Sequence, residues 1–124
     1  MCLVMLRITR LALVVSVATA GSVALAQPAP AHPTPQKLLA FGRSMLNAGH
    51  PQAALAFLEE AVTISPSLAD GYELLGDAWT TVGRFDKAVV AYEKFLALAP
   101  ADPRAKLITR AVADLKPRRR HTSG

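Results

Sequence analysis

The chain has 124 residues, of which 52% are hydrophobic, and carries a formal net charge of +5. This length allows one small domain at most. The only cysteine, Cys2, lies in an apolar N-terminal stretch, so the rest of the chain has no thiol for a disulfide or for a thiolate metal site.

Residues 1–26 are typical of a bacterial secretory signal peptide. Two arginines, Arg7 and Arg10, precede an uncharged apolar run, and Ala24-Leu25-Ala26 supplies the small residues that a signal peptidase requires. We expect cleavage after Ala26, with residues 18–20 as a second candidate. The uncharged run over 11–26 is shorter than the roughly 20 residues of a membrane-spanning helix. A periplasmic or secreted protein is therefore favoured over the alternative, an uncleaved leader anchored in the inner membrane.

Residues 27–34 form a Pro/Ala-rich linker, because proline disfavours helix at the preceding residue. Proline and glycine punctuation then predicts four helices, over 35–47, 51–64, 68–82 and 85–99. Thr34 is the expected N-cap of the first helix and Ser67 that of the third.

Two stretches of the chain repeat each other at an offset of 34 residues. The small, charged and proline positions that recur are Gly42 and Gly76, Gly49 and Gly83, Ala54 and Ala88, Glu59 and Glu93, and Pro66 and Pro100. A repeat of this period is a helix–turn–helix unit, which buries its apolar face only by stacking on a neighbour. The pattern predicts an all-α fold with repeats at about 35–68 and 69–102.

A capping helix is expected after the second repeat, over 103–116, beginning at Asp102-Pro103. Its apolar positions fall on one stripe that would cover the second unit. The members of this stripe are Leu107, Ile108, Ala111, Val112 and Leu115. We expect Pro117 to stop this helix and residues 117–124 to form a basic disordered tail.

The second unit resembles the tetratricopeptide repeat. The resemblance rests on Tyr72-x2-Leu75-Gly76-x2-Trp79, then Ala88-x3-Tyr92-x2-Phe95, then Pro100. The first unit is a weaker copy. The small residues Gly76 and Ala88 are expected where the two helices cross closely. Phe95 stands where the family usually has a small residue, and we expect it to fill space against the capping helix. The resemblance implies a TPR-type α-solenoid of two antiparallel helix pairs plus one capping helix.

Family members, as this resemblance implies, bind peptides or partner proteins in a concave groove lined by the first helix of each repeat. If these units stack in the same way, the groove-lining residues are Gln36, Leu39, Arg43, Leu46, Asn47, Asp70, Glu73, Asp77, Thr80 and Thr81. Arg43 and Asp77 occupy equivalent positions, so we expect them to face each other.

Charge is divided along the chain. Residues 37–102 carry five Lys/Arg and eight Asp/Glu, whereas residues 103–124 carry seven Lys/Arg and one acid. Because Asp70, Glu73 and Asp77 share one helical face, a partner segment with some positive charge is favoured. The run Arg118-Arg119-Arg120 suits a phosphate-rich membrane surface, an acidic partner or the acidic groove of a second copy. The alternative is a soluble end with no role. Nucleic acid is not expected, because the protein is predicted to be exported and no aromatic residue interleaves the run.

No enzyme, cofactor or metal is predicted. The three histidines are far apart in sequence, and Glu59 and Glu60, being adjacent, point in different directions on their helix. The expected function is a non-catalytic protein–protein interaction module or adaptor in the periplasm. About three stacked repeats are normally needed for independent stability, so the alternative is a structural protein that self-associates by stacking with other copies, a homo-oligomer.

Overall fold

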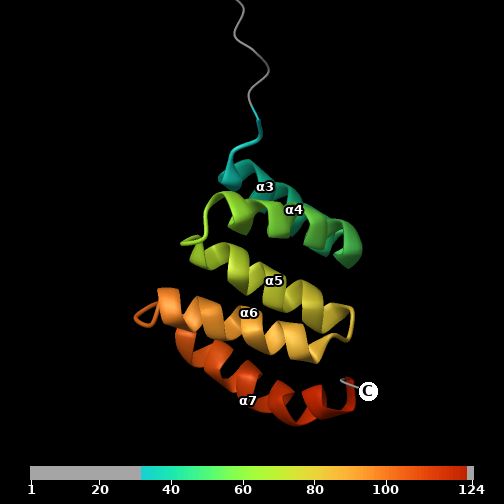
Figure 1. Cartoon of the computed structure of the whole chain (residues 1–124), viewed down its shortest axis with the longest axis vertical. Helices are drawn as coiled ribbons and strands as arrows, with labels where there is room; N and C mark the ends of the chain where they lie inside the picture. Colours follow the sequence, from blue (N-terminus) through green and yellow to red (C-terminus); the bar gives the residue numbers. More distant parts are fainter. Residues whose placement is uncertain (1–31, 123–124) are drawn as a thin grey trace, which may run out of the picture. The chain divides into compact units, whose positions relative to one another are not determined.

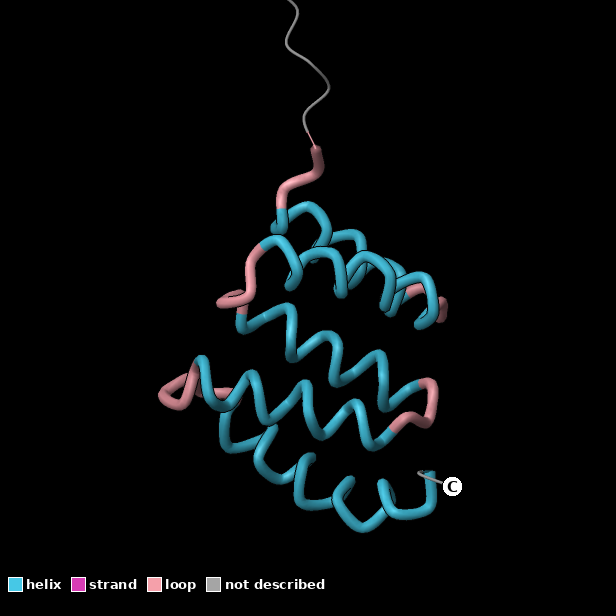
Figure 2. Tube along the Cα trace, in the orientation of Figure 1, coloured by secondary structure: helices cyan, strands magenta, loops and turns pink. Residues whose placement is uncertain are grey.

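The computed structural model describes residues 32–122, which form five helices and, within that range, no strand (Figures 1 and 2). The predicted signal peptide and most of the predicted linker lie outside the described residues, as do residues 123 and 124. Among the residues described, none of the helices is both long and apolar enough to cross a membrane.

Four helices form the two predicted pairs. The first pair is α3 (Pro35–Asn47) and α4 (Pro51–Ile64), and the second is α5 (Ala69–Thr81) and α6 (Phe85–Leu98). Neighbouring helices run in opposite directions and follow one another down a stack (Figure 2). Their bounds lie within one residue of the predicted ones, because prolines and glycines mark both ends of each helix.

The two predicted caps have different outcomes. The hydroxyl of Thr34 accepts a hydrogen bond from the backbone N–H of Lys37 at 3.3 Å, as an N-cap does. The prediction for Ser67 is wrong, because Leu68 holds the N-cap position of α5 and no side chain caps that helix. The N–H of Leu68 donates to the carbonyl of Ser65 at 3.1 Å, so a turn occupies 65–68 and the helix begins one residue late.

Small residues allow the two helices of each pair to approach closely. A Cβ atom added to Gly42 would lie 2.5 Å from Leu58 Cδ2, and one added to Gly76 would lie 2.3 Å from Tyr92 Cε1. Both distances are far inside normal carbon–carbon contact. The facing alanines Ala54 and Ala88 have no exposed surface. The predicted close crossings are confirmed.

The two repeats are joined by a continuous apolar layer. Helix α4 contributes Leu55 and Leu58 to a buried cluster with Leu75 and Ala78 of α5. Gly71 permits this contact, because a Cβ atom there would lie 2.5 Å from Val62 Cγ1 of α4. Gly71 has no counterpart in the first repeat, where the equivalent residue is Lys37, and the sequence pattern did not reveal its role.

The last helix, α7, spans Ala105–Thr122. The predicted range of 103–116 is therefore too short, and the predicted disordered tail is wrong for residues 117–122. Pro117 removes a single backbone donor from the interior of the helix. The next residue, Arg118, places its guanidinium 5.9 Å from the centre of the Phe85 ring. This contact with α6 helps to keep residues 117–122 helical, although a proline usually ends a helix.

Helix α7 covers α6 as a capping helix should. Its side chains Ile108, Val112 and Leu115 are buried in a cluster with Phe95, which has no exposed surface. The expectation for Phe95 is thereby confirmed. The inclusion of Leu107 in the buried stripe is wrong, since its side chain is 69% exposed. Leu107 lies 34 residues after Glu73 and so has the same position in the repeat register.

Candidate interaction surfaces

The first helices of the two repeats, α3 and α5, and the turn before α7 present one surface, which we call the A-helix face. Five of the ten predicted groove residues line a hollow of about 500 Å³ on this surface, together with Ala40 and Ser44. These five are Gln36, Leu39, Arg43, Asn47 and Asp70. The hollow combines an aliphatic wall with amide groups and one charge of each sign.

The other predicted residues do not line this hollow. Leu46 packs, partly buried, against the core between the repeats. The hydroxyl of Thr80 donates to the Gly76 carbonyl at 2.7 Å, and that of Thr81 donates to the Asp77 carbonyl at 2.8 Å. Both threonine hydroxyls thus donate their hydrogen bonds within α5, and neither is left to donate to a partner.

Arg104 reaches back from the turn before α7 to the acidic residues of α5. Its guanidinium donates to Asp70 Oδ1 at 2.7 Å and to Glu73 Oε2, and its Nε donates to Asp102 Oδ1 at 2.9 Å. The guanidinium also lies 5.3 Å from the centre of the Phe95 ring. One side chain therefore ties α5, α6 and the start of α7 together.

The carboxyl groups in this network have shifted pKa values. Hydrogen bonds from the side chain and backbone of Arg104 lower the pKa of Asp102 to about 2. Burial raises the pKa of Glu73; Arg104 acts in the opposite direction, and the neighbouring carboxylates Asp77, Asp70 and Asp102 raise it further. The carboxylates thus repel one another even though Arg104 lies among them.

Asp77 has a partner within its own repeat. The hydroxyl of Tyr92 donates to Asp77 Oδ1 at 2.5 Å. Burial, together with this carboxylate, raises the pKa of Tyr92 well above its usual range. The expected juxtaposition of Arg43 and Asp77 yields no ion pair, and Arg43 has no ion-pair partner among residues 32–122.

The acidic character of the A-helix face survives these contacts. The guanidinium of Arg104 binds three carboxylates, those of Asp70, Glu73 and Asp102, and a fourth, that of Asp77, lies near enough to Glu73 to raise its pKa. About half of the Asp70 side chain remains exposed. A cation brought to this surface by a partner would find carboxylate oxygens that one arginine does not neutralise.

Sequence reasoning missed Arg104 and Tyr92 as members of this surface. For Arg104 a signal was present, since it lies 34 residues after Asp70 and 68 after Gln36. The same offset would have identified the beginning of α7 as a third copy of a first helix. For Tyr92 the pattern indicated only a packing residue, and its hydroxyl contact could not be inferred from spacing.

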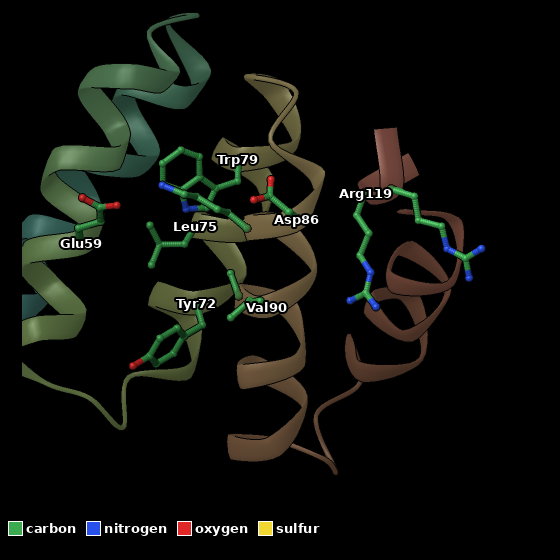
Figure 3. A pocket seen from close by; sticks show the side chains of 10 residues that line it. Glu59, Tyr72, Leu75, Trp79, Asp86, Val90 and Arg119 are labelled. Carbon is green, nitrogen blue, oxygen red and sulfur yellow. The ribbon is translucent and has the colours of Figure 1, made fainter. Parts of the chain in front are cut away.

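A second hollow, of about 600 Å³, lies between α4 and α6 (Figure 3). Side chains of α5, namely Tyr72, Leu75 and Trp79, are seen between the two helices, with Glu59 on the α4 side and Val90 on the α6 side.

Cationic side chains border this second hollow. The ammonium group of Lys87 lies 4.2 Å from the centre of the Trp79 ring, a distance typical of a cation–π contact. Arg119 and Arg120 also line it. With Arg118 over Phe85, the basic run lies along the folded domain, rather than on a tail that extends from it.

No set of three or more His, Cys, Asp or Glu side chains in the described part of the chain is arranged to hold a metal ion. The arrangement offers surfaces for contact instead, with apolar walls and fixed charges.

The architecture is that of an all-α repeat protein, with two helix pairs stacked in register and a further helix over the second. Residues 69–102 match a family model described as Tetratricopeptide repeat. The matched residues are those of α5 and α6, and α3 and α4 form a second helix pair of the same form, which supports a tetratricopeptide-repeat protein. No curated protein matched the chain. Proteins of this family are generally non-catalytic and mediate the binding of other proteins.

Proposed function

We propose that the protein is an adaptor of the bacterial periplasm, or a secreted one, that binds a partner protein or peptide through the A-helix face. The family supports the binding role. The leader pattern of residues 1–26 supports export. The hollow beside α3 supports the choice of surface, since it joins an apolar wall at Leu39 to hydrogen-bonding groups at Gln36 and Asn47.

The observation that carries the proposal is the excess of carboxylates on this face. Asp70, Glu73 and Asp102 share the one guanidinium of Arg104, and Asp77 adds a fourth carboxylate beside Glu73. A partner segment with a lysine or arginine would gain charge-assisted hydrogen bonds there. An aliphatic neighbour of that cation could occupy the hollow at Leu39. We therefore favour an exported partner whose binding segment is basic and partly apolar.

Asp77→Asn tests the surface without dismantling the fold. The amide oxygen of asparagine still accepts the hydrogen bond of Tyr92, whereas the charge is lost. The matched control is Glu59→Gln, which removes one carboxylate from an exposed position on α4, bordering the other hollow. Both variants should unfold at nearly the temperature of the wild-type protein.

Capture from periplasmic extract, with the wild-type protein and both variants as baits, gives the readout. We expect a protein that the wild-type and Glu59→Gln baits retain and the Asp77→Asn bait loses, with retention by the wild-type bait falling as salt rises. Equal retention by all three baits would exclude Asp77 and its surface from binding.

Export is tested separately. N-terminal sequencing of the protein from fractionated cells should place it in the periplasm or medium, with Gln27 as its first residue. Recovery of the intact chain from the inner membrane would support the anchored alternative and leave the binding surface to be tested there.

A further inference from the structure

The outer side of the first helix pair is an apolar surface edged by charges, which we call the N-terminal end face. It comprises Lys37 and Phe41 of α3 and Phe57, Glu60 and Ile64 of α4. The rings of Phe41 and Phe57 meet with their centres 5.7 Å apart. Phe41 is 51% exposed and Ile64 52% exposed, so large apolar side chains remain in water here.

The second repeat shows how the positions of Phe41 and Phe57 are used when a neighbouring helix pair is present. At an offset of 34, Phe41 corresponds to Leu75, and Phe57 corresponds to Ala91. Leu75 is 5% exposed and Ala91 is 7% exposed, and both belong to the buried cluster between the repeats. In the second repeat Leu75 thus belongs to the contact with the preceding helix pair, and Ala91 is buried in the same cluster. In the first repeat nothing among residues 32–122 covers the corresponding positions.

The N-terminal end face carries one positive and one negative side chain, Lys37 and Glu60, which would meet if two copies of the face were related by a two-fold axis. Lys37 lies one turn before Phe41 on α3, and Glu60 lies one turn after Phe57 on α4. Because the two helices are antiparallel, both charges are at the same end of the face. Within the described range neither side chain has an ion-pair partner.

We propose that the N-terminal end face binds the same face of a second copy of the chain. With the two-fold axis parallel to the helices, α3 of one copy lies over α4 of the other. Phe41 then meets the partner's Phe57, and Lys37 meets the partner's Glu60, each contact occurring twice by symmetry. The arrangement covers the same positions that the first repeat covers in the second.

The size of the face sets the strength of this dimer. Helices of 13 and 14 residues are about 20 Å long, and side by side they offer a face of about 400 Å² per copy. Specific complexes bury roughly 1,200 Å² or more in total. The dimer should therefore be weak and reversible, with dissociation in the micromolar range, and separate from the A-helix face used for a partner.

Two charge reversals give a direct test. Lys37→Glu puts an acid in the first turn of α3, and Glu60→Lys puts a base in the C-terminal half of α4, where the helix dipole tolerates or favours each. Each variant alone sets like charges against each other at both symmetric contacts. A mixture of the two variants restores opposite charges at both contacts, but only between different chains.

Sedimentation equilibrium of the chain, purified in the form its host produces, measures the result. We expect a concentration-dependent dimer for the wild type, and about tenfold weaker association for each single variant. The mixture should form a heterodimer near wild-type strength, and Phe41→Glu should be monomeric. Far-UV circular dichroism melts confirm that every variant is folded.

The proposal is overturned by a wild type that remains monomeric over the whole concentration range. That result would mean that the face is covered by residues outside the described range or by a different protein. A mixture no more associated than its two components would also overturn it, since the Lys37–Glu60 contact between copies would then not exist. Assembly beyond a dimer would contradict the two-fold geometry.

Discussion

Gly76→Ala is the sharpest test of the helix crossing within the second repeat. The added methyl would lie 2.3 Å from Cε1 and 2.4 Å from Cδ1 of Tyr92, whereas carbon atoms prefer about 3.5–4.0 Å. The Tyr92 ring is 6% exposed and its hydroxyl is held by Asp77. The ring must therefore move by about 1 Å or more, and the hydrogen bond lengthens or breaks.

The magnitude follows from three contributions. Overpacking a core position costs about 1–3 kcal/mol. Loss of a hydrogen bond to a charged group costs about 1.5–3 kcal/mol, and the better helix propensity of alanine returns about 1 kcal/mol. We expect a net loss of about 1.5–5 kcal/mol in the free energy of unfolding, measured by urea denaturation with circular dichroism. At roughly 4–8 °C per kcal/mol for a domain of this size, the melting temperature should fall by on the order of 10 °C or more.

Tyr92→Phe supplies the matched background. It keeps the ring that opposes the methyl group and removes the hydroxyl that binds Asp77. In this background Gly76→Ala should cost less, by about the 1.5–3 kcal/mol assigned to the hydrogen bond. A Gly76→Ala protein as stable as the wild type, with Tyr92 in place, would refute the reasoning, because the close crossing would then not exist.

Three further outcomes are expected. Arg104→Gln should lower the free energy of unfolding by about 1–2 kcal/mol in urea denaturation, because Glu73 and Asp70 lose their cation. Arg104→Lys should restore only part of this stability, because an ammonium group cannot reproduce the two-pronged hydrogen bonding of a guanidinium. Full recovery in the lysine variant would contradict a role for that geometry. The pKa of Asp102 is lowered to about 2 in the folded protein, below its unfolded value, so its contribution to stability is present above about pH 4 and lost as pH falls toward 2. Thermal melts at a series of pH values should show this loss, and Asp102→Asn should reduce it. The same pH profile in the variant and the wild type would count against the contact with Arg104. Pro117→Ala should slow amide hydrogen exchange over 118–122, because it restores a donor inside α7, and unchanged exchange would argue against helix there.

Helix positions and close crossings could be predicted from the sequence because their determinants are local or periodic. Proline and glycine end the helices wherever they fall in the fold, and the offset of 34 aligns Gly42 with Gly76. Leu107 could not be assigned from its stripe alone. An amphipathic stripe that contains two adjacent apolar residues, Leu107 and Ile108, does not say which of them is buried. The register of the preceding repeats decides it, with Ile108 4% exposed and Leu107 in water.

The candidate surface was predictable in outline, and its electrostatics were not. Gln36, Leu39 and Arg43, which the repeat register places on one side of the first helix, line one hollow. A further offset of 34 places Arg104 in the register of Asp70, but the register does not show that Asp70 and Glu73 bind its guanidinium, because it says nothing of side-chain contacts. The proline rule failed at Pro117 for a related reason, since the contact between Arg118 and Phe85 is tertiary.

The two ends of the stack differ, and Arg104 explains why. Helix α7 begins as a third copy of a first helix, so α6 is covered as α4 is covered by α5. Arg104 binds the carboxylates of α5 and lies over Phe95, which joins this last helix to the second repeat by charge as well as by apolar packing. At the other end, Phe41 and Phe57 have the positions of an inter-repeat contact without a described neighbour. One end of this solenoid is closed within the chain, and the other retains the surface by which such repeats are extended.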